Sequence, residues 1–564
     1  MVRCHDLPAS RISDFGSTEI LSLKPEDKPL TDFVKDYIKQ SISRRIKQVP
    51  IRLFDLSLES PKLITRWDLV KKLEDKMVEF DKELLSIDPT QWAETTQKKV
   101  DPHLRYAILS HRWANGEPLF PQADKEFSSW WSAPEAQGPG IRKLIQFCRI
   151  AQSKDINLAW SDTCCIDKSP TADSTELPES LTSMFQWYRR ADLCIVHMAD
   201  TTSWSDMEQK EWEDQWFKRG WTLQELLAPR LLKFYTKDWE ELIKGSEDDK
   251  HIDRSEDGQD TEHGKVIRKV LEKVSKATGI EVAQIEDFRP EKSDVPIRQR
   301  MIWASQRETT KDEDIAYCMM GIFDVGMDVR YGEGGEEAFY RLQEQVIKRH
   351  RDNSLFNWYG QPSIHNTVIA SHPRCFSHNH DEKLARYRFS ERGFFTKLFC
   401  TCTGLTCMNA CMTQVCSCAV RIEVLVQAGE IINQGESHFE VTNNGLRIKV
   451  DTTRVLYMYS LPHKDGNHRR YLYLAGHKRI KVAFTPAMKK EIDDQKNGRG
   501  EFVVIPLGTE GDTSEGERLQ RIGLLLYKVD NNSWKRVRTV KPIVLQRTQM
   551  KLVSEDLLHT IYIR

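Results

Sequence analysis

Hydrophobic positions along the chain follow two patterns. Short continuous apolar runs predict buried strands, and runs with apolar residues every three or four positions predict amphipathic helices. Between residues 106 and 235 the two patterns alternate, with strands predicted to start at Tyr106, Leu158, Leu193 and Leu231. Strands that alternate with helices in this way predict a parallel sheet with helices on both faces.

The flanking regions have other patterns and divide the chain into four predicted parts. Residues 1–100 are polar with helical spacing of apolar positions, and residues 101–240 contain the strand–helix alternation. Residues 241–352 predict a helical extension, and residues 353–564 predict short strands separated by turns, which is typical of an all-β domain. Within the extension, the charged, glycine-punctuated run from Ser246 to Gly264 predicts an exposed or flexible insertion.

Composition and charge narrow the classes of function. The 564 residues include 83 Lys and Arg against 84 Asp and Glu, a net charge of -1 that argues against a general nucleic-acid binder. No apolar run reaches membrane-spanning length, and the amino terminus lacks the apolar core of a signal peptide. The 13 cysteines are scattered and odd in number. We therefore expect reduced thiols and a cytoplasmic protein.

Polar residues follow the ends of the first two strands of the predicted sheet. Ser110, His111 and Arg112 end the first strand, and Asp162 follows the second. Ligands of parallel sheets bind beyond the carboxyl ends of the strands, so we expect these side chains at one rim. Ser110 and His111 are not expected to act as a nucleophile and its base, because adjacent residues on a strand point to opposite sides.

The segment from Arg219 to Arg230 adds a short helix that contains an acid. Gly220 permits a sharp turn before the helix, and Pro229 ends it. Trp221 and Glu225 are four residues apart and share a helical face. Spacing alone leaves two interpretations open. Glu225 is either a charged residue at a domain surface or an active-site acid beside an aromatic wall that tunes its pKa.

Three blocks of sequence resemble the HET (heterokaryon incompatibility) domain of filamentous fungi. They are Tyr106 to Trp113, Trp160 to Asp167 together with Met184 to Ala191, and Arg219 to Pro229. Residues 299–304 and 331–334 also resemble the segment that follows this domain in mushroom-type members. The resemblance implies an effector of vegetative incompatibility and regulated cell death.

The HET domain is in turn remotely similar to TIR domains, which have a flavodoxin-like parallel sheet. Leu109 to Arg112 stands where plant TIR domains have Leu-Ser-Phe-Arg, and Trp221 to Leu226 stands where they have Trp-Cys-Leu-x-Glu-Leu. Catalytic TIR domains use that glutamate to cleave the nicotinamide–ribose bond of NAD. The resemblance therefore implies NAD as substrate, no further cofactor, Glu225 as catalytic residue, and a nucleotide pocket lined by Ser110, Arg112, Asp162 and Trp221.

The sequence departs from the TIR pattern at His111, at Thr222 and in the long loop from Ala199 to Lys218. Whether the domain is an enzyme therefore stays open, and the alternative is a non-catalytic signalling module that acts by self-association. We find no nucleotide-binding P-loop and no WD or ankyrin repeat. The chain is therefore expected to work as a homo-oligomer or with an incompatibility receptor.

A dense group of cysteines lies in the predicted β domain, at Cys400, Cys402, Cys407, Cys411, Cys416 and Cys418. Four thiolates are a suitable ligand set for zinc or another soft metal. The spacing lacks paired CxxC motifs, however, and no histidine lies within the run. A reduced hairpin insertion is an equal alternative, so we assign no metal site. A metal-dependent regulator is the third hypothesis for the chain.

Overall fold

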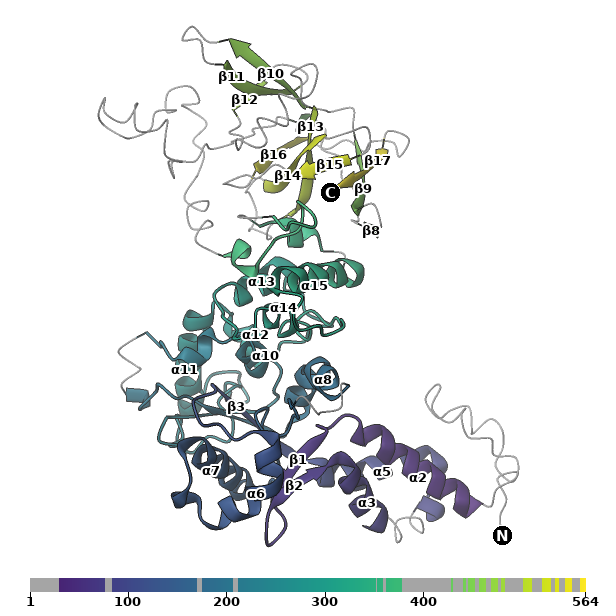
Figure 1. Ribbon diagram of the computed structural model, residues 1–564, viewed down its shortest axis with the longest axis vertical. Coiled ribbons are helices and arrows are strands. Elements are labelled where there is room, and N and C mark those ends of the chain that lie inside the picture. The colour runs from purple at the N-terminus through teal and green to yellow at the C-terminus, as the bar shows by residue number, and fades with distance from the viewer. Residues whose placement is uncertain are drawn as a thin grey trace. The chain divides into compact units, whose positions relative to one another are not determined.

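A six-stranded sheet organises residues 1–293, the first of two units into which the chain divides; residues 294–564 form the second. The computed structural model describes residues 30–377 apart from 77–83, 170–174, 206–210, 351 and 359–361. Beyond residue 377 it describes the strands that lie between 428 and 563. Figure 1 labels the elements of both units.

The strands of the first sheet are arranged in the order β2-β1-β4-β3-β5-β6. β3 to β6 run parallel to one another, and β1 and β2 join them in antiparallel pairs. The parallel part, taken in chain order, has the arrangement 2-1-3-4 that is found in flavodoxin-like sheets. We predicted a parallel sheet, and the structure has a mixed one, because β1 and β2 are antiparallel. The strands are β1 Arg52–Asp55, β2 Lys62–Thr65, β3 Tyr106–His111, β4 Leu158–Trp160, β5 Leu193–His197 and β6 Leu232–Tyr235.

Helices connect consecutive parallel strands. α6 (Phe120–Ser132) and α7 (Pro139–Ser153) lie between β3 and β4, α8 (Glu176–Arg190) between β4 and β5, and α10 (Thr222–Leu227) between β5 and β6. α7 packs against β3 and β4, whereas α10 packs against α8 and β3. The inward positions of α7 have helical spacing, as predicted, with Leu144, Phe147, Cys148 and Ala151 buried.

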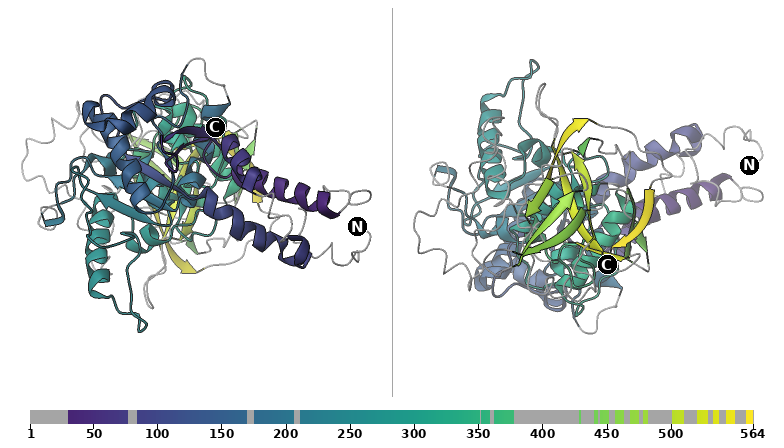
Figure 2. Two further views of the ribbon diagram at one scale, coloured as in Figure 1. Left: turned by 90° about the horizontal axis from the view of Figure 1, so that it is seen from below. Right: turned by 90° about the horizontal axis from the view of Figure 1, so that it is seen from above.

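The region before residue 101, predicted to be mostly helical, also supplies the strands β1 and β2. Helices α2 (Leu30–Ile46), α3 (Arg66–Lys76) and α5 (Trp92–Val100) form as the apolar spacing predicts, and α3 and α5 pack against α2 (Figure 2). β1 pairs with β4 through Phe54 and Asp55. Without β1, the outer backbone of β4 would lie at an open sheet edge, which proteins generally cover.

The run from Ser246 to Gly264, predicted to be exposed or flexible, contains buried residues, among them Asp249 and Lys250. Its charges bind the backbone of neighbouring elements, a use that composition does not reveal. The helices α11 (Glu262–Thr278) and α12 (Val282–Glu286) follow within the same unit. The two units divide after Ser293, and the domain boundaries at 240 and 352 stay predictions.

The second unit begins with the helices α13 (Ile297–Ser305), α14 (Asp314–Tyr317) and α15 (Gly335–Arg349). α14 is a single turn of helix, and the chain turns after Tyr317. An eleven-stranded sheet follows, with strands β7 Ala428–Gly429, β8 Glu440–Thr442, β9 Gly445–Asp451, β10 Leu456–Pro462, β11 His468–Leu474, β12 Lys478–Lys481, β13 Glu501–Thr509, β14 Gln520–Lys528, β15 Ser533–Arg536, β16 Ile543–Gln549 and β17 Leu558–Ile563. The cysteine group from Cys400 to Cys418 lies outside the described residues.

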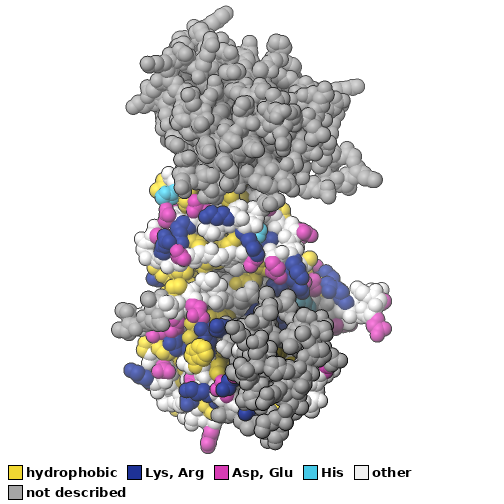
Figure 3. All heavy atoms as spheres, turned by 90° about the vertical axis from the view of Figure 1, so that its right-hand side faces the viewer, with side chains coloured by type: hydrophobic (Ala, Val, Ile, Leu, Met, Phe, Trp, Pro, Cys, Tyr) yellow, Lys and Arg dark blue, Asp and Glu magenta, His cyan; other side chains and the backbone are white. Residues whose placement is uncertain are grey.

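Two properties of the described residues bear on partners. None of the helices in this part of the chain has the length and apolar character needed to cross a bilayer. Acidic and basic side chains are interspersed on the face that Figure 3 displays, in keeping with the balanced charge of the sequence.

We predict that Phe54→Ala destabilises the first unit by about 3–5 kcal/mol, because a fully buried ring is lost from a packed core. Phe54 is 0% exposed and stacks on Phe127 of α6, with ring centroids 4.1 Å apart. Denaturant unfolding of the full chain measures the change, with Leu119→Ala at a half-exposed position of the same unit as the control. A loss below about 1 kcal/mol would mean that β1 is not part of the core.

Candidate functional site

The candidate site lies at the carboxyl ends of β3 and β5, the two central parallel strands. These are the first and third parallel strands of the chain, and β3 pairs with β5 from Ala107 to His111, where His111 stands opposite His197. The strand order reverses direction at this pair, because the connection from β3 leads to β4 on one side and the later strands lie on the other. Such a switch point is where doubly wound sheets bind their ligands.

Ser110 and Glu225 are in direct contact on one face of β3. The Ser110 hydroxyl donates a hydrogen bond to Glu225 Oε2 at 2.6 Å, and the Trp216 indole N–H donates to Ser110 Oγ at 2.9 Å. All three side chains are buried, and Glu225 is 3% exposed. Two of the residues predicted to form the site, Ser110 and Glu225, therefore contact one another, and Trp216, which was not among the predicted residues, binds the serine.

The helix α10 that contains Glu225 is held mainly by its surroundings. With six residues it is too short to be stable alone. The Thr222 hydroxyl lies 2.6 Å from the carbonyl oxygen of Trp216 and 2.8 Å from that of Arg219, and it ties the start of α10 to the preceding turn. Leu223, Leu226 and Leu227 are buried, as their spacing predicted.

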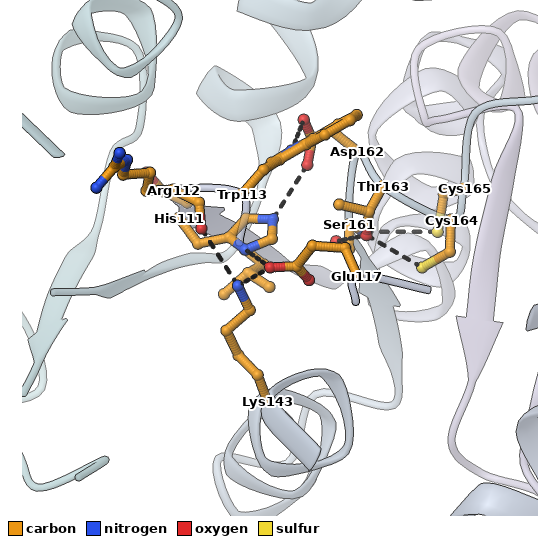
Figure 4. Close-up of polar contacts among 12 residues, drawn as sticks. His111, Arg112, Trp113, Glu117, Lys143, Ser161, Asp162, Thr163, Cys164 and Cys165 are labelled. Carbon is orange, nitrogen blue, oxygen red and sulfur yellow. Dashed lines mark hydrogen bonds and ion pairs between the residues drawn. The ribbon is translucent and has the colours of Figure 1, made fainter. Parts of the chain in front are cut away.

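Asp162 is the centre of a second polar network, which involves the residue next to Ser110 (Figure 4). Its carboxylate accepts hydrogen bonds from His111 Nε2 at 3.2 Å and from Trp113 Nε1 at 2.8 Å, and it lies 3.7 Å from the Arg219 guanidinium. Burial favours the neutral acid, but the His111 hydrogen bond and the charges of Lys168 and Arg219 outweigh it and hold the pKa of Asp162 below its usual value. Asp162 is therefore a carboxylate at neutral pH, and His111 Nε2 carries a hydrogen.

The opposite side of the His111 ring faces a buried ion pair, which the sequence analysis missed. Lys143 of α7 pairs with Glu117 and donates to the Arg112 carbonyl oxygen at 3.2 Å, and His111 Nδ1 lies 3.9 Å from Glu117 Oε1. Figure 4 shows these side chains converging on the ring. Burial and the nearby Lys143 charge lower the pKa of His111. Glu117 lies in a loop after β3 that contains Gly, Pro and Ala and no recognisable motif. Nothing in the sequence therefore singled it out as a partner of Lys143.

The five residues predicted to form the site therefore fall into separate environments. Ser110 and Glu225 contact one another, and Asp162 binds His111 and Trp113 instead. Arg112 is exposed, whereas Trp221 is only 8% exposed. Glu225 is buried rather than open to solvent, and its carboxylate accepts a hydrogen bond from Ser110.

Comparisons with known proteins find a family likeness in part of this unit. The family model described as Heterokaryon incompatibility protein (HET) matches residues 106–214, which contain β3, β4 and β5. The chain contains a HET domain. The matched segment lies within the predicted domain of residues 101–240, and it ends before the helix that contains Glu225. A second model, described as Domain of unknown function (DUF8212), matches residues 337–414.

A curated relative extends the likeness beyond the HET segment. The vegetative incompatibility protein HET-E-1 of Podospora anserina is 35% identical over 265 residues, which is 44% of this chain and 16% of that protein. The match thus spans about a sixth of the relative's length. No solved structure matches the chain.

The described cysteines and acids give no metal site. Six described cysteines form no disulfide, and burial raises the pKa of Cys148, Cys165 and Cys194. Within the described ranges, no three or more His, Cys, Asp or Glu side chains are placed to hold a metal ion. The metal hypothesis for Cys400 to Cys418 stays a prediction, since those residues lie outside the described part.

We predict that His197 makes the first unit sensitive to acid. His197 is 8% exposed and stacks on Trp239 with centroids 4.3 Å apart, and burial lowers its pKa to about 4. Between that value and the ordinary 6.5 the unfolded chain binds more protons than the folded one, so stability falls as the pH falls through this window. The full difference amounts to roughly 3 kcal/mol.

The measurement is the unfolding free energy at pH 7 and pH 4 for wild type and His197→Gln. The change in unfolding free energy of the variant is subtracted from that of wild type, which cancels groups that titrate in both proteins. One of these is Asp249, whose raised pKa makes stability rise as the pH falls. Wild type is expected to lose more stability than the variant, and the exposed His103→Gln serves as the control. Equal losses in wild type and His197→Gln would contradict the prediction.

Proposed function

We propose that this chain acts in heterokaryon incompatibility through its HET domain, and that the domain cleaves the nicotinamide–ribose bond of NAD when chains assemble in the cytoplasm. The observation that supports this proposal is the contact between Ser110 and Glu225 at the switch point of the sheet. It joins a carboxylate from α10 with a hydroxyl from the first parallel strand, at the place where such sheets bind ligands.

The chemistry requires few groups. Nicotinamide leaves as a neutral molecule that takes the bonding electron pair, and the ribose passes through an oxocarbenium-like state that a single carboxylate can stabilise. Water then bonds to the same ribose carbon and releases a proton to solvent. Glu225 has that role in the proposal, and its hydrogen bond from Ser110 fixes where the charge lies. Arg112, Asp162 and Trp221 contact the rest of the nucleotide once the site has opened, and the reaction needs no additional cofactor.

Buried polar groups without partners also favour a functional site over a purely structural one. His111 Nδ1 and the Gln224 side-chain Nε2 are buried, and neither has a hydrogen-bond partner among the described residues. An unsatisfied buried donor or acceptor costs about 1–3 kcal/mol, and proteins keep few of them without a reason. These two residues adjoin Ser110 and Glu225 in the sequence.

The conformation described here is closed, since Glu225 is 3% exposed. Opening breaks the Ser110–Glu225 and Trp216–Ser110 hydrogen bonds, which together contribute roughly 2–4 kcal/mol. Such a cost leaves an open fraction between about 1 in 30 and 1 in 1,000. Assembly that binds the open form more tightly by a similar free energy would make it the main form. A homo-oligomer or an incompatibility receptor is the partner that this role needs.

A second candidate function is a non-catalytic signalling module. The burial of Glu225 favours it, because a buried carboxylate that accepts a hydrogen bond from Ser110 is also suited to a purely structural role. In that case the HET domain acts by self-association or by recruiting a partner, and its glutamate only stabilises the fold.

We predict that the full-length chain, fused to an inducible clustering domain, releases nicotinamide from NAD only when clustered. Glu225→Gln keeps the shape of the side chain but removes its charge, and should lower turnover at least about 100-fold. Nicotinamide release measured by chromatography gives the rate. The matched control is Glu240→Gln, whose side chain is 68% exposed in the same unit, and it should leave the rate unchanged.

Expression of the same clustered proteins in fungal cells separates the two candidates. If NAD cleavage kills, Glu225→Gln cells survive and keep their NAD. Death of cells expressing wild type or Glu225→Gln alike, with NAD levels unchanged in both, would end the catalytic proposal and establish the signalling module. Thermal unfolding of both variants shows whether the substitutions left the fold intact.

A further inference from the structure

Residues 246–250, which we call the edge segment, cover part of the outer edge of the first sheet. β6 is the last strand, and the N–H groups of Leu232 and Phe234 find partners in this segment, whereas the Phe234 carbonyl accepts from the Leu242 N–H. The Leu232 N–H donates to Asp248 Oδ1 at 3.0 Å, the Asp249 N–H donates to the Leu232 carbonyl at 2.7 Å, and the Phe234 N–H donates to Asp249 Oδ2 at 2.9 Å. Two carboxylates thus replace carbonyls of a missing strand, and they close an edge that would otherwise pair with other chains.

A buried ion pair anchors the edge segment to β6. Lys233 is 0% exposed and donates to Asp249 Oδ1 at 3.1 Å, with Glu241 Oε2 3.5 Å from the same ammonium. Removing one member of a buried pair leaves the other charge uncompensated, so this anchor is strongly held. The position of the residue that follows Asp249 is therefore fixed by β6.

That residue, Lys250, reaches from the edge segment to helix α10. It is 2% exposed, and its ammonium donates to the Leu227 carbonyl oxygen at 3.0 Å and to that of Pro229. The last carbonyls of a helix have no partner within it, and a positive charge is favourable there. Lys250 thus joins the carboxyl end of α10 to the edge segment.

The charge of Lys250 requires an explanation, because burying an ammonium is costly. Among the residues described, no carboxylate lies within ion-pair distance of the Lys250 ammonium, and its hydrogen bonds go to the carbonyl oxygens of Leu227 and Pro229. Burial lowers its pKa to about 8, an effect that the charge of Asp248 opposes. An apolar side chain would fill the same space at lower cost, so the benefit of lysine lies in its hold on the two carbonyls.

Glu225 lies two residues before Leu227 in this six-residue helix. A shift of the carboxyl end of α10 therefore moves the Glu225 carboxylate relative to Ser110, which sits on the fixed central strand. We propose that Lys250 is a positioning residue that clamps α10 to the sheet edge and thereby sets where Glu225 meets Ser110. The consequence for catalysis rests on the proposed NAD cleavage, whereas the clamp itself does not.

The test uses the full chain with Lys250→Met, which keeps the length of the side chain but removes its charge and its donors. Amide hydrogen exchange of residues 222–228 is expected to become at least about 10-fold faster than in wild type, while exchange in β3 and β5 stays unchanged. Lys244→Met, at a side chain that is 82% exposed, is the matched control. Lys250→Gln keeps N–H donors without the charge and should give an intermediate exchange rate. This variant replaces Lys250→Met in the test if Lys250→Met does not fold.

The kcat and KM of the clustered proteins separate a positioning residue from a purely structural one. Lys250→Met should lower kcat between about 10- and 100-fold and leave KM unchanged, because the acid is misplaced while the nucleotide contacts remain. If wild type releases no nicotinamide, the proposed function fails, and the exchange rates alone decide the clamp. If wild type is active and Lys250→Met keeps its kcat, or if exchange at 222–228 is unchanged, the clamp is overturned.

Discussion

The carboxyl end of β3 sends adjacent side chains to opposite faces of the sheet, and both polar networks depend on this alternation. Ser110 points to the face of α10, where Glu225 and Trp216 bind it, and His111 points to the face of α7, where Lys143 and Glu117 lie. The two side chains cannot serve a common reaction as nucleophile and base. They make β3 the element against which both the acid of α10 and the ion pair of α7 are placed.

These networks place several charged groups in surroundings that are otherwise apolar. Asp162 stays ionised because hydrogen bonds and two cations stabilise it, whereas His111 and His197 stay neutral because burial outweighs their partners. A domain built for stability alone would gain by replacing such groups with well-packed apolar residues. Asp162, His111 and His197 instead lie near the switch point, where sheets of this architecture bind ligands. This position favours a role in function.

The sequence allowed the parallel strands to be predicted, because apolar runs and strand ends are local signals. Ser110 and Glu225 were placed in one pocket only by the resemblance to TIR domains, since they come from segments distant in the chain. The sequence did not reveal β1 and β2, since Arg52–Asp55 and Lys62–Thr65 are short and pair with strands distant in the chain. It also did not reveal that Glu225 is buried or that the Trp216 indole binds Ser110. Trp216 lies in an acidic, Trp-rich loop, and no periodicity marks which tryptophan turns inward.

The run around Lys250 shows most clearly why charge patterns mislead. Charged runs in loops usually face solvent, so the sequence predicts the same for Asp248, Asp249 and Lys250. In the structure, each of these side chains instead binds a backbone group that β6 or α10 leaves unpaired. Whether a carboxylate faces water or replaces a strand's carbonyl depends on the edge beside it, and that edge is set by the order of strands in space. A sheet with β6 in an inner position would have no outward groups to satisfy, and the same three residues would then be free to face solvent.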